Sequence, residues 1–253
     1  MKPRPLGNSG LSVSPIGFGS FKIGRNQKAK YPQAYDLPDD AAAQSLMSSL
    51  CEEGITYFDT APAYGISEQR VGEFVSARRE QLVLSTKVGE TFVDGVSTYD
   101  FSATAVSASI QQSLSNLKTD GVDCIFVHSN GQDVEIQNDT DVVDVLRESR
   151  ASGQTRLIGF SGKSVEGARA ALEWADAIMV EYHLDDASHE TVMAEAAQRG
   201  IGVIVKKGLA SGHLDPTESI RFVLSNPAVS SLIVGSLNLD HMRANIRAAS
   251  ELF

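Results

Sequence analysis

The sequence predicts a single (β/α)8 barrel, the TIM-barrel class, spanning residues 1–253. Short apolar runs alternate along the chain with segments whose apolar residues recur at helical spacing. Continuous apolar strands separated by amphipathic helices indicate a parallel sheet covered by helices, and eight such units within about 250 residues match a closed barrel. A doubly wound sheet is the alternative, but no G-x-G-x-x-G motif follows a first strand. No linker or low-complexity tract interrupts the chain, which favours one domain.

The expected strands are short and apolar, as strands buried on both faces usually are. They cover residues 14–19, 55–58, 82–86, 122–127, 155–160, 177–180, 202–205 and 229–234. Three of these runs are followed directly by a polar residue with useful chemistry, namely Asp59, Lys87 and His128. Because barrel active sites lie at the carboxyl ends of the strands, these three positions are candidate site residues.

The expected helices fill the intervals between the strands. In the first helix, Asp39 or Asp40 suits the N-cap and Gly54 suits the end. Its apolar residues fall on one helical face; they are Ala43, Leu46, Met47, Leu50 and Cys51. The later helices are expected to begin near Ser67, to cover 106–117, 142–151, 165–174, 188–199 and 217–224, and to begin again at Asp240.

Composition excludes several classes of partner. The net charge of −10 and the pI near 5.0 argue against nucleic acid or an anionic membrane surface, because both need a basic face. No apolar run approaches the ~18 residues of a membrane span, and the N-terminus lacks a signal-peptide pattern, so a cytoplasmic location is expected. The remaining histidines show no metal-ligand spacing, which predicts no metal site; they are His183, His189, His213 and His241.

The most informative segment is Asp59-Thr60-Ala61-Pro62-Ala63-Tyr64-Gly65, which begins at a strand end and continues into the loop beyond. If the barrel brings the strand ends together, the acid of Asp59, the phenol of Tyr64, the amine of Lys87 and the imidazole of His128 share one pocket. Such a set suits proton transfer to a carbonyl oxygen.

These residues resemble the aldo-keto reductases, and the likeness runs from about Arg4 to Ala248. It rests on four segments in the order and strand positions of that family. They are the opening Arg4–Gly7 with Gly10–Ser14, the Asp-Thr-Ala-x-x-Tyr-Gly motif, Ser85-Thr86-Lys87, and Val127-His128. The resemblance is to short, bacterial-type members, because the chain ends at Phe253 without a long C-terminal tail, and it implies an N-terminal β-hairpin that caps the barrel bottom.

The resemblance implies an NAD(P)-dependent oxidoreductase that interconverts an aldehyde or ketone with an alcohol. Tyr64 would be the general acid that protonates the carbonyl oxygen, and Lys87, held by Asp59, would lower the pKa of that phenol. His128 would orient the carbonyl and donate to its oxygen. The nicotinamide cofactor would supply the hydride.

Further positions are expected, by the same resemblance, to contact the cofactor. They are Gly19, Ser20, Phe21, Asp59, Ser161, Lys206, Lys207, Gly208, Leu209, Ser211, Gly212, Gly235, Ser236, Asn238, His241 and Asn245. The segment from Lys206 to Gly212 would offer backbone amides and two ammonium groups to the pyrophosphate, and Ser161 would contact the carboxamide.

The chain departs from the family pattern at several cofactor positions. Gly162 supplies no amide where the family has Asn, Met179 stands in place of Gln, and Lys206 stands where an aromatic ring often stacks on the nicotinamide. Gly235 and His241 replace the Lys and Arg that hold the 2′-phosphate in many NADPH-preferring members. NADP(H) is therefore expected, with NAD(H) possible, and Arg243 is a candidate substitute for the missing Arg.

The substrate and the oligomeric state are not indicated. The loop over 22–38 and the stretch over 129–141 are expected to shape the pocket for a small carbonyl or alcohol. Two other functions compete: a cofactor-binding sensor or regulatory subunit with little turnover, and a barrel enzyme of different chemistry such as a phosphate-sugar isomerase.

Overall fold

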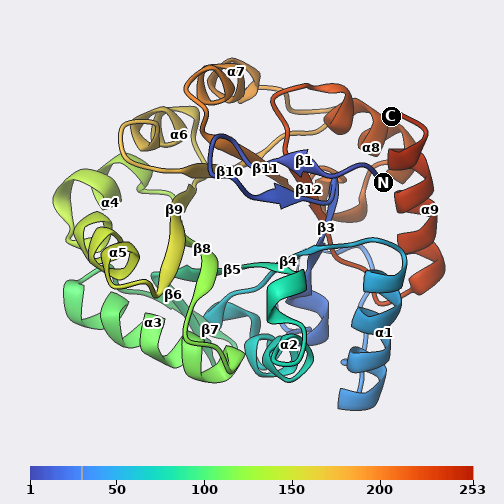
Figure 1. The fold of residues 1–253 in the computed structure, drawn as a ribbon, viewed down its shortest axis with the longest axis horizontal. Helices are drawn as coiled ribbons and strands as arrows, with labels where there is room; N and C mark the ends of the chain where they lie inside the picture. The colour runs from blue at the N-terminus through green and yellow to red at the C-terminus, as the bar shows by residue number, and fades with distance from the viewer. Residues whose placement is uncertain (30, 253) are drawn as a thin grey trace.

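The computed structural model describes residues 1–29 and 31–252, so Lys30 of the expected 22–38 loop and the terminal Phe253 lie outside the described residues. Eight parallel strands close into a barrel whose order around the ring follows the chain (Figure 1). They are β3 (Ile16–Gly19), β4 (Tyr57–Asp59), β5 (Val83–Val88), β8 (Val122–His128), β9 (Thr155–Ser161), β10 (Ala177–Glu181), β11 (Gly202–Lys206) and β12 (Ser231–Val234). The predicted barrel is confirmed.

Helices surround the barrel on its outside (Figure 1). Their bounds are α1 (Asp40–Glu52), α2 (Ser67–Val75), α3 (Ala103–Leu117), α4 (Asp133–Asp139), α5 (Val142–Ala151), α6 (Val165–Ala171), α7 (Glu190–Gln198), α8 (Pro216–Ser225) and α9 (Leu239–Ser250). The Asp39 side chain caps α1, as expected, by accepting from the Ala42 amide at 2.7 Å. Helix α4 lies in the stretch over 129–141, for which no helix was predicted.

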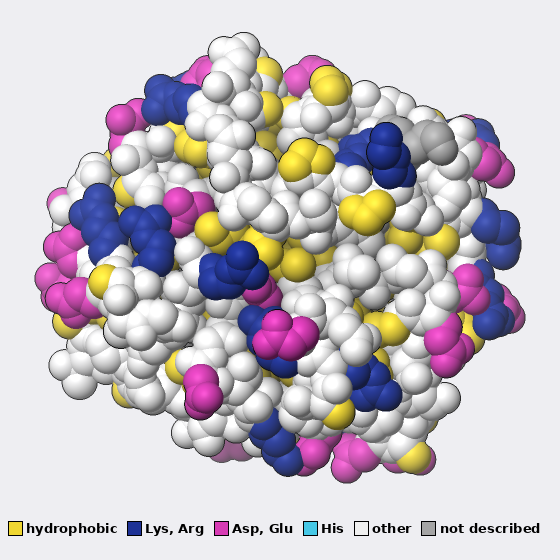
Figure 2. Space-filling model, in the orientation of Figure 1, with side chains coloured by type: hydrophobic (Ala, Val, Ile, Leu, Met, Phe, Trp, Pro, Cys, Tyr) yellow, Lys and Arg dark blue, Asp and Glu magenta, His cyan; other side chains and the backbone are white. Residues whose placement is uncertain are grey.

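The N-terminal hairpin closes one end of the barrel. Strands β1 (Arg4–Pro5) and β2 (Ser12–Val13) pair antiparallel, and Leu6, Leu11 and Val13 pack against the inner barrel side chains. The Asn8 amide donates to Gly200 O at 2.7 Å, just before β11 begins. The hairpin therefore covers the amino-terminal ends of the strands, as predicted. Figure 1 shows it across the centre of the ring, and Figure 2 shows that this face carries scattered acidic and basic side chains.

A second hairpin, β6 (Glu90–Val93) and β7 (Val96–Tyr99), follows β5 directly and was not predicted. Its turn is Asp94-Gly95, with φ of 50° and 81°. Two successive residues with positive φ form the tight turn that matches strand twist, and Asp-Gly is a preferred sequence for it. This hairpin places Glu90 beside the carboxyl end of β5.

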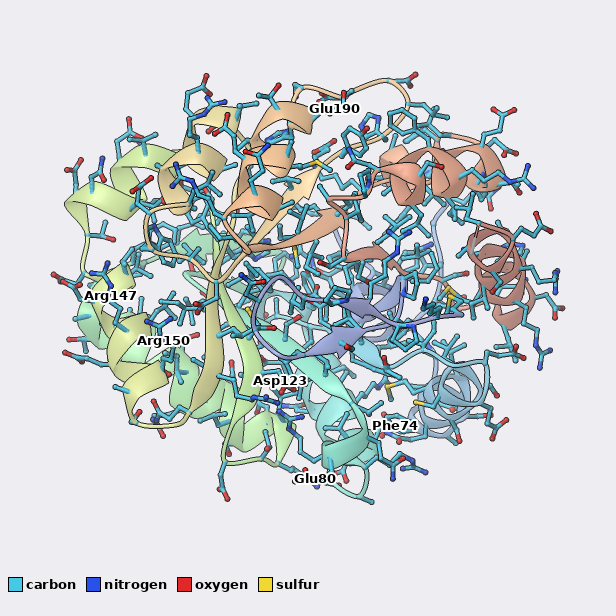
Figure 3. All side chains as sticks on the ribbon, turned by 45° about the horizontal axis from the view of Figure 1, so that its top comes forward. Phe74, Glu80, Asp123, Arg147, Arg150 and Glu190 are labelled. Carbon is cyan, nitrogen blue, oxygen red and sulfur yellow. The ribbon has the colours of Figure 1, made fainter. Side chains whose placement is uncertain are left out.

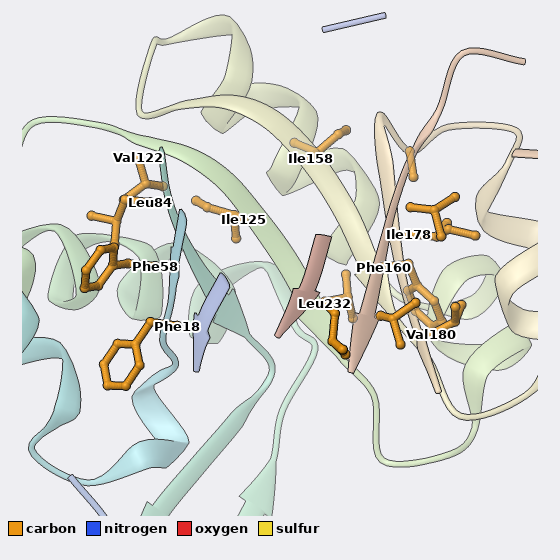
Figure 4. Packing of buried hydrophobic residues seen from close by; sticks show 14 of the residues in the cluster. Phe18, Phe58, Leu84, Val122, Ile125, Ile158, Phe160, Ile178, Val180 and Leu232 are labelled. Carbon is orange, nitrogen blue, oxygen red and sulfur yellow. The ribbon is translucent and has the colours of Figure 1, made fainter. Parts of the chain in front are cut away.

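Side chains alternate along the strands between two hydrophobic layers. Those that point outward, including Phe58, Leu84 and Ile125, pack under the helices (Figure 4). Their neighbours in sequence, such as Tyr57 and Val83, point into the barrel. Because successive strand residues face opposite sides, the same alternation turns the residue at the carboxyl end of several strands toward the barrel axis.

A buried carboxylate at the opposite end of the barrel has a structural role. Asp123, near the start of β8, is labelled in Figure 3. It forms ion pairs with Arg79 at 2.8 Å and Arg156 at 3.2 Å, and it accepts a hydrogen bond from the Leu84 amide at 2.9 Å. These contacts connect the start of β8 with β5 and β9. Among the described residues, no helix is long and apolar enough to cross a membrane.

Candidate active site

The inward-facing strand ends line one cavity of about 400 Å3 at the carboxyl end of the barrel. Asp59 of β4, Lys87 of β5, His128 of β8 and Lys206 of β11 all contribute to its wall. Tyr64 reaches it from a short 3-10 helix over Pro62–Tyr64. The fold therefore brings the expected acid, phenol, amine and imidazole together.

Asp59 and Lys87 form a buried ion pair at the base of the cavity. Lys87 Nζ lies 2.6 Å from Asp59 Oδ2 and donates to Thr60 O at 2.8 Å, while Ser85 Oγ donates to Asp59 Oδ1 at 2.7 Å. Burial lowers the pKa of Lys87, but its interactions with Asp59 and Tyr64 outweigh burial and leave the pKa above its usual value. Lys87 is thus a permanent cation at the cavity floor.

Tyr64 lies beside this cation. Lys87 Nζ is 4.8 Å from the centroid of the Tyr64 ring, and the ring packs edge-on against Phe21 at 5.1 Å. Burial raises the pKa of the Tyr64 phenol; the Lys87 charge acts in the lowering direction but does not outweigh burial. The sequence-based expectation of a lowered pKa was therefore wrong in its net direction, because the phenol is removed from water. At neutral pH Tyr64 is a protonated phenol, ready to donate.

His128 stands across the cavity from Tyr64, with the two ring centroids 6.2 Å apart. Its Nδ1 lies 2.9 Å from Glu90 Oε2, at the start of the second hairpin. Burial lowers the pKa of His128, whereas Glu90 acts to raise it. Burial also acts to raise the pKa of Glu90, but hydrogen bonds with His128, Ser97 and Tyr99 bring it to about 2. The pair is a neutral imidazole beside an ionised carboxylate.

Sequence reasoning missed Glu90. The strand-end site residues were predicted because each directly follows an apolar run. Glu90 does not follow such a run, since it lies beyond the end of β5 and begins the second hairpin. The Asp94-Gly95 dipeptide between two short β-prone segments was the available signal for that hairpin.

Lys206 points into the barrel. Its ammonium donates to Ser161 Oγ at 2.9 Å and to Gly162 O at 2.6 Å. Burial, with the neighbouring charges of Lys207 and Lys87, lowers its pKa to about 7. The next residue, Lys207, forms an ion pair with Glu181 at the end of β10. Both ammonium groups that were expected to bind pyrophosphate thus have protein partners.

Most of the expected cofactor residues line the cavity. They are Gly19, Phe21, Asp59, Ser161, Lys206, Lys207, Gly208, Leu209, Ser211, Gly212 and Gly235. Six further lining residues come from the two stretches that were expected to shape the pocket, namely Lys22, Arg25, Lys28, Ala29, Tyr31 and Ser129. The lining residues that were not expected as contacts are Glu90, Tyr99, Lys163, Met179, Ile233 and Val234.

The other expected contacts lie outside the cavity wall. Ser20 is buried and donates to Asp59 O at 2.8 Å. Asn238 caps α9 by accepting the amides of Asp240 at 2.8 Å and His241 at 3.2 Å. Ser236 lies in the loop before that cap, His241 is exposed, and Asn245 is buried on α9.

Arg243, the candidate substitute for a phosphate-binding Arg, is engaged elsewhere. Its guanidinium lies 2.7 Å from Glu53 Oε1 and 3.5 Å from Asp240 Oδ1. The last turn of α1 thus holds this side chain.

One wall of the cavity offers backbone groups to an anion. This wall is made by small residues and by a bent backbone in which Lys207, Ala210, Ser211 and Gly212 all have positive φ. A bent segment of this kind directs backbone amides toward an anion. Within residues 1–29 and 31–252, no group of three or more His, Cys, Asp and Glu side chains is arranged to hold a metal ion.

Fold and site together define a barrel oxidoreductase with a proton-transfer set at its strand ends. The sequence model of the Aldo/keto reductase family matches residues 15–219, and the chain belongs to that family. It is 39% identical to a putative aldo-keto reductase from Pseudomonas aeruginosa, with a TM-score of 0.91 and coverage of 98% of this chain and 94% of that one.

Two other relatives are more distant. The aldo-keto reductase AKR11C1 from Bacillus halodurans, solved in its holo form, is 26% identical with a TM-score of 0.84, over 98% of this chain and 90% of that one. L-galactose dehydrogenase of Arabidopsis thaliana is 28% identical over 98% of this chain and 88% of the relative. The similarity therefore covers nearly the whole barrel.

Proposed function

We propose that this chain is an NAD(P)-dependent oxidoreductase that interconverts an aldehyde or ketone with an alcohol, with Tyr64 as the general acid and base. The observation that carries this proposal is the buried Asp59–Lys87 pair beneath the Tyr64 phenol, in a cavity that also holds His128. The bound nicotinamide coenzyme supplies or accepts the hydride.

Each side chain has a distinct task in this reaction. Tyr64 donates its proton to the carbonyl oxygen, and the fixed Lys87 cation stabilises the phenolate that remains. Asp59 keeps Lys87 charged and in place. His128 fixes the substrate oxygen near the phenol, and the burial of the Asp59–Lys87 pair strengthens its electrostatic effect on the phenol.

Tyr64→Phe tests the acid assignment. The variant keeps the ring and its packing against Phe21 but has no proton to donate, so turnover of a reactive aromatic aldehyde should fall by about three orders of magnitude or more. Coenzyme binding, followed by fluorescence titration, should remain within about threefold of wild type. Wild-type turnover in this variant would overturn the assignment.

We propose NADP(H) as the coenzyme, with NAD(H) also accepted. A bidentate Arg to the 2′-phosphate is a strong contact. Here Arg243 is held by Glu53, and Gly235 has no side chain to offer. NADPH should therefore bind more tightly than NADH by less than about 100-fold, or about 2.7 kcal/mol. Parallel titrations of both coenzymes check this, and tighter NADH binding would reverse the assignment.

A nicotinamide-binding sensor with little turnover is the second candidate. It is favoured by the cavity floor, where Met179 and the ammonium of Lys206 offer no amide and no aromatic ring to the coenzyme. Tight coenzyme binding without turnover across a broad carbonyl panel would establish the sensor.

We also place the protein in the cytoplasm with a small-molecule partner. Cys51 and Cys124 are both free thiols, as is usual in a reducing compartment.

A further inference from the structure

Glu90 and the partly exposed His128 form a close pair on the wall of the cavity. The Nδ1 atom of His128 is buried and lies 2.9 Å from Glu90 Oε2, which is ion-pair distance, but the two groups are not aligned as a regular hydrogen bond. Because His128 also lines the cavity, its other ring nitrogen, Nε2, is the one that faces a bound substrate.

The second hairpin holds Glu90 in this position. Glu90 pairs in register with Tyr99 across β6 and β7, and the nearby Ser97 and Tyr99 side chains act to lower the pKa of its carboxyl group. The guanidinium of Arg25 packs 3.3 Å from the centroid of the Phe92 ring on the same strand. The backbone pairing of the hairpin therefore places the Glu90 carboxylate beside His128.

The charge of Glu90 determines which nitrogen of His128 carries the proton. An ionised carboxylate accepts hydrogen bonds and donates none. Its contact with Nδ1 is attractive only when Nδ1 bears a hydrogen, because two lone pairs at 2.9 Å repel. A neutral imidazole has a single N–H, so in neutral His128 the cavity-facing Nε2 presents a lone pair.

Other titratable groups face the same pair. Lys87 acts on His128 as a cation, and Lys206, whose pKa is about 7, does so only while it is protonated; Tyr64 lies with its ring centroid 6.2 Å away. Arg25 and Tyr99 lie near Glu90. Among the described residues that line the cavity, the other carboxylate is Asp59, which is bound to Lys87. Glu90 is thus the group that sets the tautomer.

We propose that Glu90 is a positioning residue that makes neutral His128 a hydrogen-bond acceptor toward the substrate, so that His128 holds an alcohol when neutral and a carbonyl only as the imidazolium. This inference rests on the proposed function, since it concerns the same site. A hydroxyl donates to the Nε2 lone pair, whereas a carbonyl oxygen needs an N–H there. Lowering the pH therefore favours carbonyl reduction, and raising it favours alcohol oxidation.

Imidazole nitrogen NMR tests the tautomer without any turnover. The probe is the wild-type protein labelled with 15N-histidine at pH 8, and the His128→Asn spectrum identifies the His128 signals. The expected result is a protonated Nδ1 and an unprotonated Nε2. A protonated Nε2 in neutral His128 would overturn the proposal, whatever the activity of the enzyme.

Glu90→Gln tests the consequence for catalysis. The amide can donate to Nδ1, which allows the Nε2–H form and lets neutral His128 donate to a carbonyl. In wild type, kcat/KM for aldehyde reduction should fall about tenfold or more from pH 6 to 9, and in Glu90→Gln by several-fold less. The KM for the matching alcohol at pH 8 should rise in the variant while NADPH affinity stays unchanged.

Two further variants complete the test. Glu73→Gln removes a charge from an exposed ion pair with Lys118, outside the cavity wall, and should keep the wild-type pH profile. Glu90→Asp keeps the negative charge but shortens the side chain, so that the carboxylate no longer contacts His128 Nδ1. Its pH profile should therefore resemble that of Glu90→Gln. Identical pH profiles in wild type and both Glu90 variants would overturn the proposal. Full activity of Tyr64→Phe would instead reject the proposed function and leave the NMR result standing.

Discussion

The Asp59–Lys87 pair shows how one buried interaction serves both the fold and the site. Both side chains are at most 3% exposed, and taking two charges out of water is costly unless they are paired and hydrogen-bonded. The Ser85 hydroxyl and the Thr60 carbonyl provide those additional bonds. The pKa of Lys87 is raised in the folded protein. The contribution of the ion pair to the free energy of unfolding is therefore present at neutral pH and is lost only as the pH rises through that raised pKa.

Asp59→Asn should therefore destabilise the protein strongly. The substitution leaves the Lys87 ammonium buried without its counter-charge, and we expect a loss of about 3–5 kcal/mol in the free energy of unfolding. Urea unfolding at pH 7 measures this. Glu195→Gln is the matched control: it breaks an exposed ion pair with Arg169 and should cost less than about 1 kcal/mol. Equal losses in the two variants would contradict the prediction.

At this residue scale, sequence reasoning located the strand-end chemistry but not its surroundings. Asp59, Lys87 and His128 were predictable because each follows an apolar run, and parallel strands bring such positions to one edge. The contact of Glu90 with His128 and the bond from Lys206 to Ser161 depend on how loops and neighbouring strands orient side chains. The net pKa of Tyr64 depends on burial, which a local sequence does not reveal.

At the scale of elements, the strands were predictable because they are continuous apolar runs, whereas the short polar elements were not. Helix α4 buries only Asp133 and Ile136, so it has no apolar stripe to detect. Its first residue connects two loops: Asp133 Oδ2 accepts hydrogen bonds from the backbone amides of Lys163 and Ser164, each at 2.7 Å. This contact joins the loop after β8 to the loop after β9, on the side of the barrel that holds the cavity.

The N-terminal hairpin depends on Gly7, which has φ of +54°. A Cβ atom there would lie 2.3 Å from Gly200 O and 2.6 Å from Gly202 N. Both are backbone atoms that cannot move aside cheaply. Gly10 is a matched control in the same hairpin, with φ of +77° and no atom within 4 Å of its Cβ position.

Gly7→Ala should therefore cost more stability than Gly10→Ala. Both variants carry the strain of a positive φ, about 1–2 kcal/mol, but only Gly7→Ala adds a backbone clash. We expect an additional loss of about 1–3 kcal/mol in the free energy of unfolding, measured by urea denaturation. If the two variants unfold at the same urea concentration, the hairpin is not tightly seated on the barrel.

At the scale of the whole molecule, the barrel is closed by contacts between the two ends of the chain. Strand β12 pairs with β3, placing Leu232 beside Ile16, and Ser231 Oγ donates to Ser14 O at 2.8 Å. The Arg4 guanidinium adds bonds to Val229 O at 2.8 Å and Leu224 O at 2.7 Å. Neither half of the chain completes the sheet alone, which is the physical basis for the predicted single domain.

We therefore expect the chain to unfold in one cooperative transition. Its single tryptophan, Trp174, follows α6, where the indole donates to Gln137 Oε1 at 2.8 Å and packs edge-on against Phe160. Trp174 fluorescence and far-UV circular dichroism should give the same urea midpoint, because losing one strand pair exposes the edges of the whole barrel. A second probe, Phe222→Trp in a Trp174→Phe background, reports from α8, where Phe222 stacks on Tyr182 at 4.9 Å. Midpoints that differ between the two probes would show that the two regions unfold separately and that the barrel is not one cooperative unit.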